Sequence, residues 1–382
     1  MSLQLAAHDG PRLCIDLGAL EHNWQVVRGV CPGSRVGAVV KNDAYGLGVS
    51  NVVPQLWQWG CRDFWVATVD EALAVRACLP ADARAAGLRI LVLNGLAGLT
   101  AEDFAAHGLT PVLAGPHELA ALTGYAARHD KRFPVALHLD TGLTRLGFGT
   151  AELAQLQSGS RLWDDAQVQL WVTNLWRFHD PEALQCQRQR ERFVQWTAQL
   201  PRAERSVATS SSVFAGPGWH FEQVRVGSAL FGVPIGAHAA ELLQPVASLR
   251  APVLRVADVS EGTEVGYAGS YVTGGPRRIA TVAMGYGHGL PFSLVNCGHL
   301  ILAGRPAPIV GGVAMGMVGL DVSGYAPGEI QPGMWAEVYG RQQPLQTLAA
   351  AAGVAANVVL ALSAALAPHR RQCGAAETME AA

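Results

Sequence analysis

Ala38-Val-Val-Lys41-Asn-Asp-Ala-Tyr45-Gly-Leu-Gly48 is an apolar run that ends at a lysine and continues as a polar loop containing glycine. The run has the composition of a buried β-strand, so Lys41 is predicted to lie where that strand ends. Burial disfavours the charged ammonium group and lowers its pKa, which makes the amine a better nucleophile towards an aldehyde. The same pattern also fits a strand that ends in a solvated lysine, so the interpretation depends on the rest of the chain.

Apolar runs of β type alternate with helical patterns between residues 35 and 233. The runs cover residues 36–40, 64–68, 89–93, 109–113, 134–139, 167–173, 206–209 and 223–230, and helical patterns cover 71–79, 117–129 and 187–200. Thr68-Val-Asp-Glu71 is a capping box that begins the first of these helices. Near-continuous apolar strands separated by helices are typical of a parallel sheet covered by helices. The pattern predicts an N-terminal (β/α)8 TIM barrel, with an open doubly wound sheet as the alternative.

Polar residues gather where these strands end. The motif Asp140-Thr-Gly-Leu-Thr-Arg145-Leu-Gly follows the fifth strand, and the other strand-end residues are Lys41, Asn174, Ser210, Arg225 and Gly227. In a TIM barrel the carboxyl ends of the strands carry the chemistry, and the last two commonly bind phosphate. The sequence therefore predicts one site at this mouth of the barrel.

The pattern of apolar and turn residues changes after about residue 234. Short β-runs at 247–256, 279–284, 299–303, 307–310 and 334–339 alternate with Gly and Pro turns, which predicts a mainly antiparallel C-terminal β-domain. We expect the barrel over 12–238, with residues 1–11 pairing with the β-domain, the β-domain over 239–371 and a disordered tail over 372–382. Residues 348–367 carry no charge, but alanine content and Gly353 favour two short packed helices over a membrane span.

The composition limits the class of protein. Half of the 382 residues are hydrophobic, 15% are charged and the net charge is −2, which gives no indication of a nucleic-acid or membrane partner. The seven cysteines form no CxxC pair and no metal-ligand cluster, so no metal is expected. Their odd number and the absence of a signal peptide in residues 1–11 favour a reduced, cytoplasmic chain.

Six motifs, in this order along nearly the whole chain, resemble the fold-type III, pyridoxal 5′-phosphate (PLP)-dependent alanine racemase family. They are Val39-Val-Lys41-Asn-Asp-Ala-Tyr45-Gly, Asp140-Thr-Gly-Leu-Thr-Arg145-Leu-Gly, Val224-Arg225-Val-Gly227, Val265-Gly-Tyr267-Ala-Gly-Ser-Tyr271, Met284-Gly-Tyr286-Gly-His-Gly and Pro308-Ile-Val-Gly-Gly-Val-Ala-Met315. Each motif alone is a weak signal, whereas their shared order on the expected elements is specific.

The resemblance implies that PLP is held as a Schiff base on Lys41. The residues implied to bind its phosphate are Tyr45, Ser210, Gly227 and Ser228; Arg145 would reach its phenolic oxygen and Arg225 its ring nitrogen, with Asn174 beside them. Because arginine keeps its proton at neutral pH, the ring nitrogen would stay largely unprotonated. Such a ring favours quick removal and return of the substrate α-proton over side reactions.

Racemisation needs a proton-transferring group on each face of the substrate Cα. The resemblance implies Lys41 on one face and, from the β-domain of a partner subunit, Tyr267 on the other. Tyr286 would line the entrance, and the backbone N–H of Met315, with Arg145, would bind the substrate carboxylate. A homodimer with shared active sites follows, acting on a small amino-acid substrate.

Six positions depart from the usual pattern of that family. Asn174 replaces a histidine that packs on the cofactor, and the others are His138 for a lysine, His179 for an acidic residue, Phe292 for a basic one, Gly316 for an aspartate and Asn357 for a tyrosine. They suggest a racemase for alanine or for a different or broader set of amino acids. The alternatives are another PLP reaction at Cα, such as an aldolase, decarboxylase or epimerase using His138, His179 or His288, and, ranked last, a non-catalytic PLP-binding protein.

Overall fold

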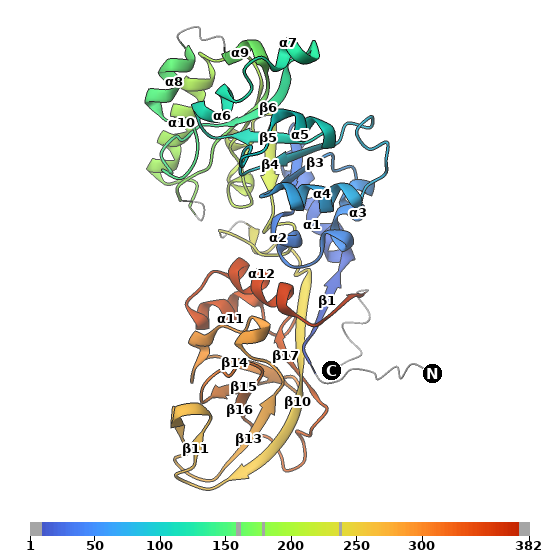
Figure 1. Ribbon diagram of the computed structural model, residues 1–382. Coiled ribbons are helices and arrows are strands. Elements are labelled where there is room, and N and C mark those ends of the chain that lie inside the picture. The colour runs from blue at the N-terminus through green and yellow to red at the C-terminus, as the bar shows by residue number, and fades with distance from the viewer. Residues whose placement is uncertain (1–9, 158–161, 178–179, 237–238, 374–382) are drawn as a thin grey trace, which may run out of the picture.

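Eight parallel strands in the N-terminal half of the chain form a barrel (Figure 1). The computed structural model describes residues 10–157, 162–177, 180–236 and 239–373. The strands are β2 (Arg35–Val39), β3 (Asp63–Val66), β4 (Arg89–Val92), β5 (Thr110–Leu113), β6 (Phe133–His138), β7 (Ala166–Val172), β8 (Glu204–Ser206) and β9 (Gln223–Val226). From β2 to β8 each strand pairs with the next one in chain order, and β9 pairs with β2. The predicted (β/α)8 barrel is confirmed.

Helices cover the outside of the barrel. They are α1 (Leu17–Val30), α3 (Val49–Gln58), α4 (Val69–Ala77), α5 (Ala101–His107), α6 (Pro116–Ala120), α7 (Tyr125–His129), α8 (Thr150–Gln157), α9 (Leu162–Asp165) and α10 (Leu184–Thr197). The predicted capping box begins α4: Thr68 Oγ1 accepts from Glu71 N, and Glu71 Oε2 accepts from Thr68 N. The single helix predicted over 117–129 is two, because Gly124 takes a left-handed conformation, φ 81°, before α7.

Burial on both faces explains the near-continuous apolar strands. In β3, Trp65 points into the barrel and packs with Leu91, Val112 and Leu170 from neighbouring strands. Its neighbour Phe64 belongs to the larger core between the strands and the helices. Successive side chains of a strand point to opposite faces, so a strand buried on both sides has no polar alternation.

The second half of the chain is an antiparallel sheet that lies below the barrel in Figure 1. Its strands, in spatial order, are β13 (Arg277–Val282), β16 (Val318–Asp321), β15 (Arg305–Val310), β14 (His299–Leu302), β17 (Trp335–Tyr339), β10 (Ala247–Val259), β1 (Arg12–Asp16) and β18 (His369–Cys373), with a separate pair β11 (Glu264–Val265) and β12 (Tyr271–Val272). The exception to antiparallel pairing is β1 with β18. Strand β1 thus belongs to this sheet and not to the barrel.

The C-terminal strand corrects two expectations from the sequence. Gln372 and Cys373, expected in a disordered tail, pair with Ile15 and Asp16 of β1; residues 1–9 and 374–382 lie outside the described residues. Cys373 also forms a disulfide with Cys14, so the expectation of a reduced chain does not hold for this pair. The two cysteines are 359 residues apart in sequence, and only the pairing of β1 with β18 brings them together.

A buried ion network joins the barrel strands at their amino ends. Asp63 of β3 is 1% exposed and accepts hydrogen bonds from Arg35 of β2 and Arg89 of β4, and from Gln223 Nε2 of β9 at 2.7 Å. Arg89 also forms an ion pair with Glu204 of β8, with 2.8 Å between Arg89 Nη2 and Glu204 Oε2. The network therefore links strands on both sides of the seam between β8 and β9, where no ladder of backbone bonds is found among the described residues.

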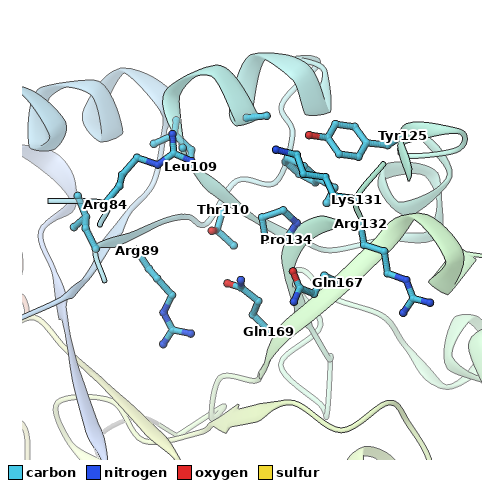
Figure 2. A pocket seen from close by; sticks show the side chains of 14 residues that line it. Arg84, Arg89, Leu109, Thr110, Tyr125, Lys131, Arg132, Pro134, Gln167 and Gln169 are labelled. Atoms are coloured by element: carbon cyan, nitrogen blue, oxygen red, sulfur yellow. The ribbon is translucent and has the colours of Figure 1, made fainter. Parts of the chain in front are cut away.

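A cavity of about 640 Å³ lies at this amino-terminal mouth of the barrel (Figure 2). Its polar lining includes Arg84, Lys131, Arg132, Gln167 and Gln169. None of the residues that the sequence predicted for the site lines it. The chemistry expected from the sequence therefore belongs to the opposite mouth.

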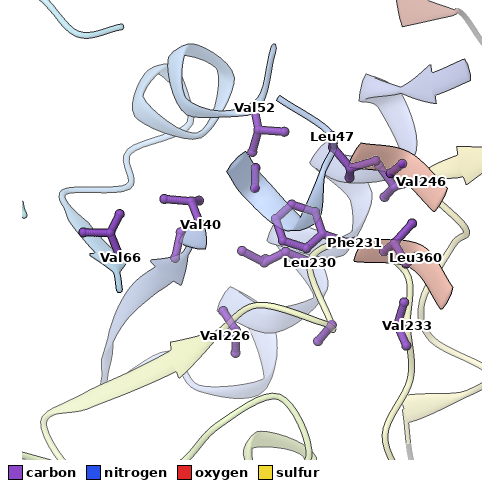
Figure 3. Close-up of a cluster of buried hydrophobic side chains, with 14 of the residues drawn as sticks. Val40, Leu47, Val52, Val66, Val226, Leu230, Phe231, Val233, Val246 and Leu360 are labelled. Atoms are coloured by element: carbon purple, nitrogen blue, oxygen red, sulfur yellow. The ribbon is translucent and has the colours of Figure 1, made fainter. Parts of the chain in front are cut away.

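The alanine-rich segment forms two helices, as predicted. They are α11 (Leu345–Ala352) and α12 (Ala356–Leu366), with an angle of 105° between them beyond Gly353. Among the described residues no single helix has the length and apolarity to cross a membrane, and this bent pair meets the criteria by length and composition only. Figure 3 shows Leu360 of α12 beside Val233 and Val246, so the core continues from the barrel into the β-domain.

Candidate active site

A cavity of about 660 Å³ opens at the carboxyl ends of the barrel strands. Its lining includes all eight residues that the resemblance implied for the cofactor: Lys41, Tyr45, Arg145, Asn174, Ser210, Arg225, Gly227 and Ser228. They come from the ends of β2, β6, β7, β8 and β9, which lie far apart in the sequence and meet only when the barrel closes. This is the mouth at which TIM barrels place their reacting groups.

The turn that carries Lys41 is left-handed, where the sequence predicted only an irregular loop. In α2 (Lys41–Tyr45), Asn42 to Tyr45 have φ between 52° and 58°. Each such residue other than glycine costs about 1–2 kcal/mol. Ala44 N bonds to Val40 O at 2.9 Å, and Asn42 N to Glu71 Oε1 at 2.8 Å. These bonds hold the strained turn, and both Lys41 and Tyr45 line the cavity as a result.

The environment of Lys41 favours its neutral amine. Burial lowers the pKa of Lys41, the positive charge of Arg145 lowers it further, and Glu71 opposes the change. A lower pKa means that a larger fraction of the amine carries a free electron pair near neutral pH. Lys41 is therefore suited to attack an aldehyde and to accept a proton.

Arg225 presents one hydrogen-bond donor to this cavity. Its side chain, 4% exposed, donates from Nε to Ser206 Oγ and from one terminal nitrogen to Asn174 Oδ1, both at 3.1 Å. The other terminal nitrogen donates to the carbonyls of Thr173 and Val207. A guanidinium has five N–H groups, so one remains without a partner among the described residues. Burial and the charge of Arg145 lower the pKa of Arg225 to about 9, which leaves the group protonated at neutral pH.

The segments after the last two barrel strands form a cradle from the hydroxyls of Tyr45, Ser210 and Ser211 and the backbone at Gly227 and Ser228. Ser210 Oγ accepts from Gly227 N at 3.0 Å and from Ala229 N at 3.2 Å. Ser211 Oγ is buried and has no hydrogen-bond partner in the described part of the chain. A Cβ atom on Gly227 would lie 2.4 Å from Tyr45 Oη, so the hydroxyl occupies the space that a side chain would take. The cradle fits a phosphate group.

Ser211 is a site residue that the sequence analysis missed. It belongs to the run Ser210-Ser-Ser, of which the sequence pattern predicted only Ser210 as a site residue. The burial of the Ser211 hydroxyl, with no partner among the described residues, is the observation that identifies it.

Asp140 shapes the loop that carries Arg145. Its Oδ1 accepts from the backbone N–H groups of Gly142, Leu143 and Thr144 at 2.8–3.0 Å. Burial opposes ionisation of Asp140, but these hydrogen bonds hold its pKa below the ordinary value. The ionised carboxylate therefore folds the loop, and Arg145 lies at the mouth of the cavity beside it.

Gln189 of α10 holds the segment that follows β7. Its Oε1 accepts from Trp176 N at 2.8 Å, and its Nε2 donates to Asn174 O at 3.2 Å. The side chain is buried, and its partners lie 13 and 15 residues away in sequence. No sequence pattern identified this residue, because a lone glutamine in a helix is ordinarily a surface residue.

The residues predicted from the β-domain lie apart from this cavity. Tyr267, Tyr286 and Met315 do not line it. Tyr267 is 81% exposed and Met315 is 65% exposed, while the Tyr286 ring contacts Phe292 with 6.1 Å between ring centres. Within one chain, therefore, Lys41 and Tyr267 belong to two separate surfaces.

The positions that depart from the family pattern fall into three groups. His138, Asn174 and Asn357 line the cavity. Phe292 and Gly316 belong to the β-domain, and His179 lies outside the described residues. His288, considered for an alternative reaction, does not line the cavity. Across the described ranges, no group of three His, Cys, Asp or Glu side chains has the arrangement of a metal site.

Two family descriptions match the chain in sequence. Residues 15–234 match "Alanine racemase, N-terminal domain", and residues 246–369 match "Alanine racemase, C-terminal domain". An alanine racemase of Acidiphilium cryptum is 39% identical over 350 residues, which cover 92% of this chain and 95% of the relative. A catabolic alanine racemase of Agrobacterium fabrum is 35% identical over 357 residues, which cover 94% of this chain and 91% of the relative.

Solved structures are similar over the same length. Alanine racemase from Bartonella henselae, with covalently bound pyridoxal phosphate, superposes with a TM-score of 0.88 and 29% identity, covering 95% of this chain and 99% of that one. Alanine racemase from Streptomyces coelicolor gives a TM-score of 0.86 at 28% identity, and the match covers 94% of this chain and 97% of that one.

Proposed function

The chain belongs to the alanine racemase family, and from this premise we propose that it is a PLP-dependent racemase that interconverts L- and D-amino acids with Lys41 and Tyr267 as the two proton-transferring residues. It is an isomerase, and its cofactor is PLP. The observation that carries the residue assignment is the single cavity that holds the low-pKa amine of Lys41, the free donor of Arg225 and the anion cradle together.

The residues of the cavity fit this cofactor. When bound, PLP supplies an aldehyde that combines with amines and a ring that withdraws electrons from the substrate Cα. Lys41 would hold it covalently, and the phosphate would lie on Tyr45, Ser210, Ser211 and the backbone of Gly227 and Ser228. The free N–H of Arg225 is a donor that matches the ring nitrogen, which is an acceptor. Arg145 would bind its phenolic oxygen and the substrate carboxylate.

Proton transfer requires two groups on opposite sides of the substrate. Lys41 Nζ, whose pKa is lowered by burial, removes or returns the α-proton on one face. Tyr267 Oη acts on the other face, with Tyr286 at the entrance and Met315 N–H near the substrate carboxylate. Because Arg225 is protonated, it would donate to the ring nitrogen and would not add a third proton acceptor beside Lys41 and Tyr267.

We further propose that the active unit is a homodimer. Tyr267 is separated from Lys41 in one chain and highly exposed, together with Val272, Phe292, Met315 and Met317. Tyr267 and Met317 line one cavity of the β-domain, and large exposed apolar side chains that lie together are typical of an interface between subunits. In a two-fold dimer, each β-domain would place its Tyr267 in the cavity of the partner chain.

A mixture of two inactive variants tests the shared site. Lys41→Ala and Tyr267→Phe homodimers are each expected to be inactive. Unfolded together in equal amounts and refolded, they are expected to regain about a quarter of wild-type activity, because half of the dimers carry one intact site of two. Racemisation is measured by chiral chromatography. Mixing without subunit exchange is the control, and no recovery after demonstrated exchange would place Tyr267 in the same chain as its Lys41.

Gly227 is expected to tolerate no side chain. The Cβ of Gly227→Ala would lie 2.4 Å from Tyr45 Oη, which forces Tyr45 out of the cradle. We expect the affinity for PLP, measured by titration of its absorbance, to fall by about tenfold or more. The control is Gly218→Ala, whose Cβ would have Arg190 at 3.8 Å as its nearest neighbour. Equal affinities of the two variants would remove Gly227 from the cradle.

The preferred substrate is alanine or a different or broader set of amino acids. Asn357 lines the cavity where the family pattern has a larger tyrosine, which supports a wider passage. Racemisation of alanine, serine, lysine, arginine and aromatic amino acids, measured side by side, tests this specificity. Alanine as clearly the best substrate would exclude an altered preference, and exchange of the α-hydrogen in D₂O would exclude a non-catalytic PLP-binding protein.

We also propose domain boundaries, a location in the cell and a class of partner for this protein. Along the chain, the barrel domain would extend over residues 12–238 and the β-domain over 239–371, except that β1 pairs in the β-domain sheet and β18 continues that sheet to Cys373. The protein is cytoplasmic, which fractionation of cells would test. It acts on a small molecule and binds neither nucleic acid nor membrane, in keeping with the net charge of −2.

A further inference from the structure

His138 and Asn174 form a polar chain with Arg225 in the wall of the cavity. Asn174 Oδ1 accepts from Arg225 at 3.1 Å, and Asn174 Nδ2 lies 3.3 Å from His138 Nε2. The three residues come from β6, the segment after β7, and β9, and all three line the cavity. The exposed fraction of His138 is 6%. The chain is therefore sheltered from solvent, where an unsatisfied polar group is costly.

The donors and acceptors of this chain agree with one arrangement. Arg225 has only donors, so the group of Asn174 that faces it must be the amide oxygen. The amide NH2 of Asn174 then faces His138 and can only donate. His138 Nε2 must accept, which requires a neutral ring with its proton on Nδ1.

Backbone hydrogen bonds fix the main chain around Asn174, so its side-chain amide is the group that can still adopt two orientations. Thr173 O accepts from Arg225, and Asn174 O accepts from Gln189 at 3.2 Å. If the amide were reversed, its NH2 group would meet the donors of Arg225. One terminal nitrogen of Arg225 would then lose its acceptor, and both of its hydrogens would lack a partner among the described residues.

We propose that His138 is a positioning residue that fixes the amide of Asn174, so that Asn174 orients the free N–H of Arg225 towards the ring nitrogen of the cofactor. This inference rests on the proposed function. It assigns to His138 a role that acts through Asn174 and Arg225.

The electrostatic surroundings of His138 support its neutral state. Burial, the charge of Arg225 and the charge of Arg145 lower the pKa of His138 to about 3, and Asp140 opposes them. Above that pH the ring is neutral, so Nε2 is available as an acceptor at neutral pH. A protonated ring would present a second donor to the Asn174 NH2 group and break the chain.

The tautomer of His138 is the direct test. In holoenzyme labelled with ¹⁵N-histidine, the signals of His138 among the 12 histidines are identified by their loss in His138→Gln. We expect a proton on Nδ1 and an unprotonated Nε2 between about pH 6 and about pH 9. A proton on Nε2 would overturn the proposal.

Affinity for PLP is the second readout. His138→Leu removes the acceptor and is expected to weaken PLP binding roughly tenfold, because the Asn174 NH2 group is left unsatisfied. His138→Gln retains an acceptor oxygen and is expected to bind PLP within about twofold of wild type. Equal affinity of His138→Leu and wild type, or equal loss in both variants, would overturn the proposal.

His220 provides a matched control. It is also 6% exposed and hydrogen-bonds through Nε2 to Val213 O at 2.7 Å, but it does not line the cavity. His220→Leu is expected to lower thermal stability while leaving PLP affinity unchanged; a tenfold loss of affinity there would show that the His138 effect is merely structural. Racemisation by wild-type enzyme is measured separately. Inactive wild type with the expected tautomer counts against the proposed function, and active wild type with the other tautomer counts against this inference alone.

Discussion

Replacing Lys41 with alanine is expected to lower racemase activity by at least about 10³-fold, because one residue supplies both the covalent attachment and one of the two proton transfers. The protein should also lose covalently attached PLP, since no other amine lines the described part of the cavity. The measurements are racemisation by chiral chromatography, and borohydride reduction followed by peptide mass spectrometry. Reduction of wild type is expected to label the peptide that contains Lys41.

The sequence offers a matched control for this variant. The chain has two lysines, and the other one, Lys131, lies in the cavity at the opposite mouth of the barrel (Figure 2). Lys131→Ala is expected to retain activity and PLP within about twofold of wild type. Borohydride labelling at Lys131, or an active Lys41→Ala enzyme, would contradict the assignment.

Replacing Asp63 with alanine is expected to produce the largest loss of stability. The carboxylate is buried and accepts from Arg35, Arg89 and Gln223, so its removal leaves the partly buried charge of Arg89 with less compensation. Removing one partner from such a buried pair costs about 3–5 kcal/mol. The free energy of unfolding is measured by urea denaturation, with wild type and variant at the same PLP saturation.

An exposed ion pair in the same barrel provides the comparison. Glu102 bonds to Arg128 at 2.9 Å, and both side chains are about half exposed, at 41% and 51%. Glu102→Ala is expected to cost no more than about 1 kcal/mol, because solvent already screens the pair. If Asp63→Ala and Glu102→Ala cost the same, the network at the amino-terminal mouth does not hold the barrel seam.

Local patterns were sufficient to predict most of the fold. The eight barrel strands were predicted to within a few residues, because a strand buried on both faces is apolar along its whole length. The bend at Gly353 and the capping box at Thr68 were also predicted, because each depends on residues no more than a turn apart. The division of the helix at Gly124 was missed, because a glycine in a helical pattern does not show by itself whether the chain turns there.

The cavity residues were found in sequence because polar groups stand out at the ends of apolar strands. Ser211 and Gln189 were missed, since their importance depends on burial and on partners that the strand pattern does not contain. The separation of Tyr267 from Lys41 likewise becomes visible only when both surfaces are placed in space.

The barrel, the β-domain, the family and Lys41 were predicted from the sequence, since these depend on the order of side chains within short segments. Tertiary structure alone decided the left-handed turn at Lys41, the Cys14–Cys373 disulfide, and the order of donors and acceptors from Arg225 through Asn174 to His138. A short segment specifies which of its faces is buried. Which distant atom then satisfies a buried polar group is decided by the packing of the whole chain.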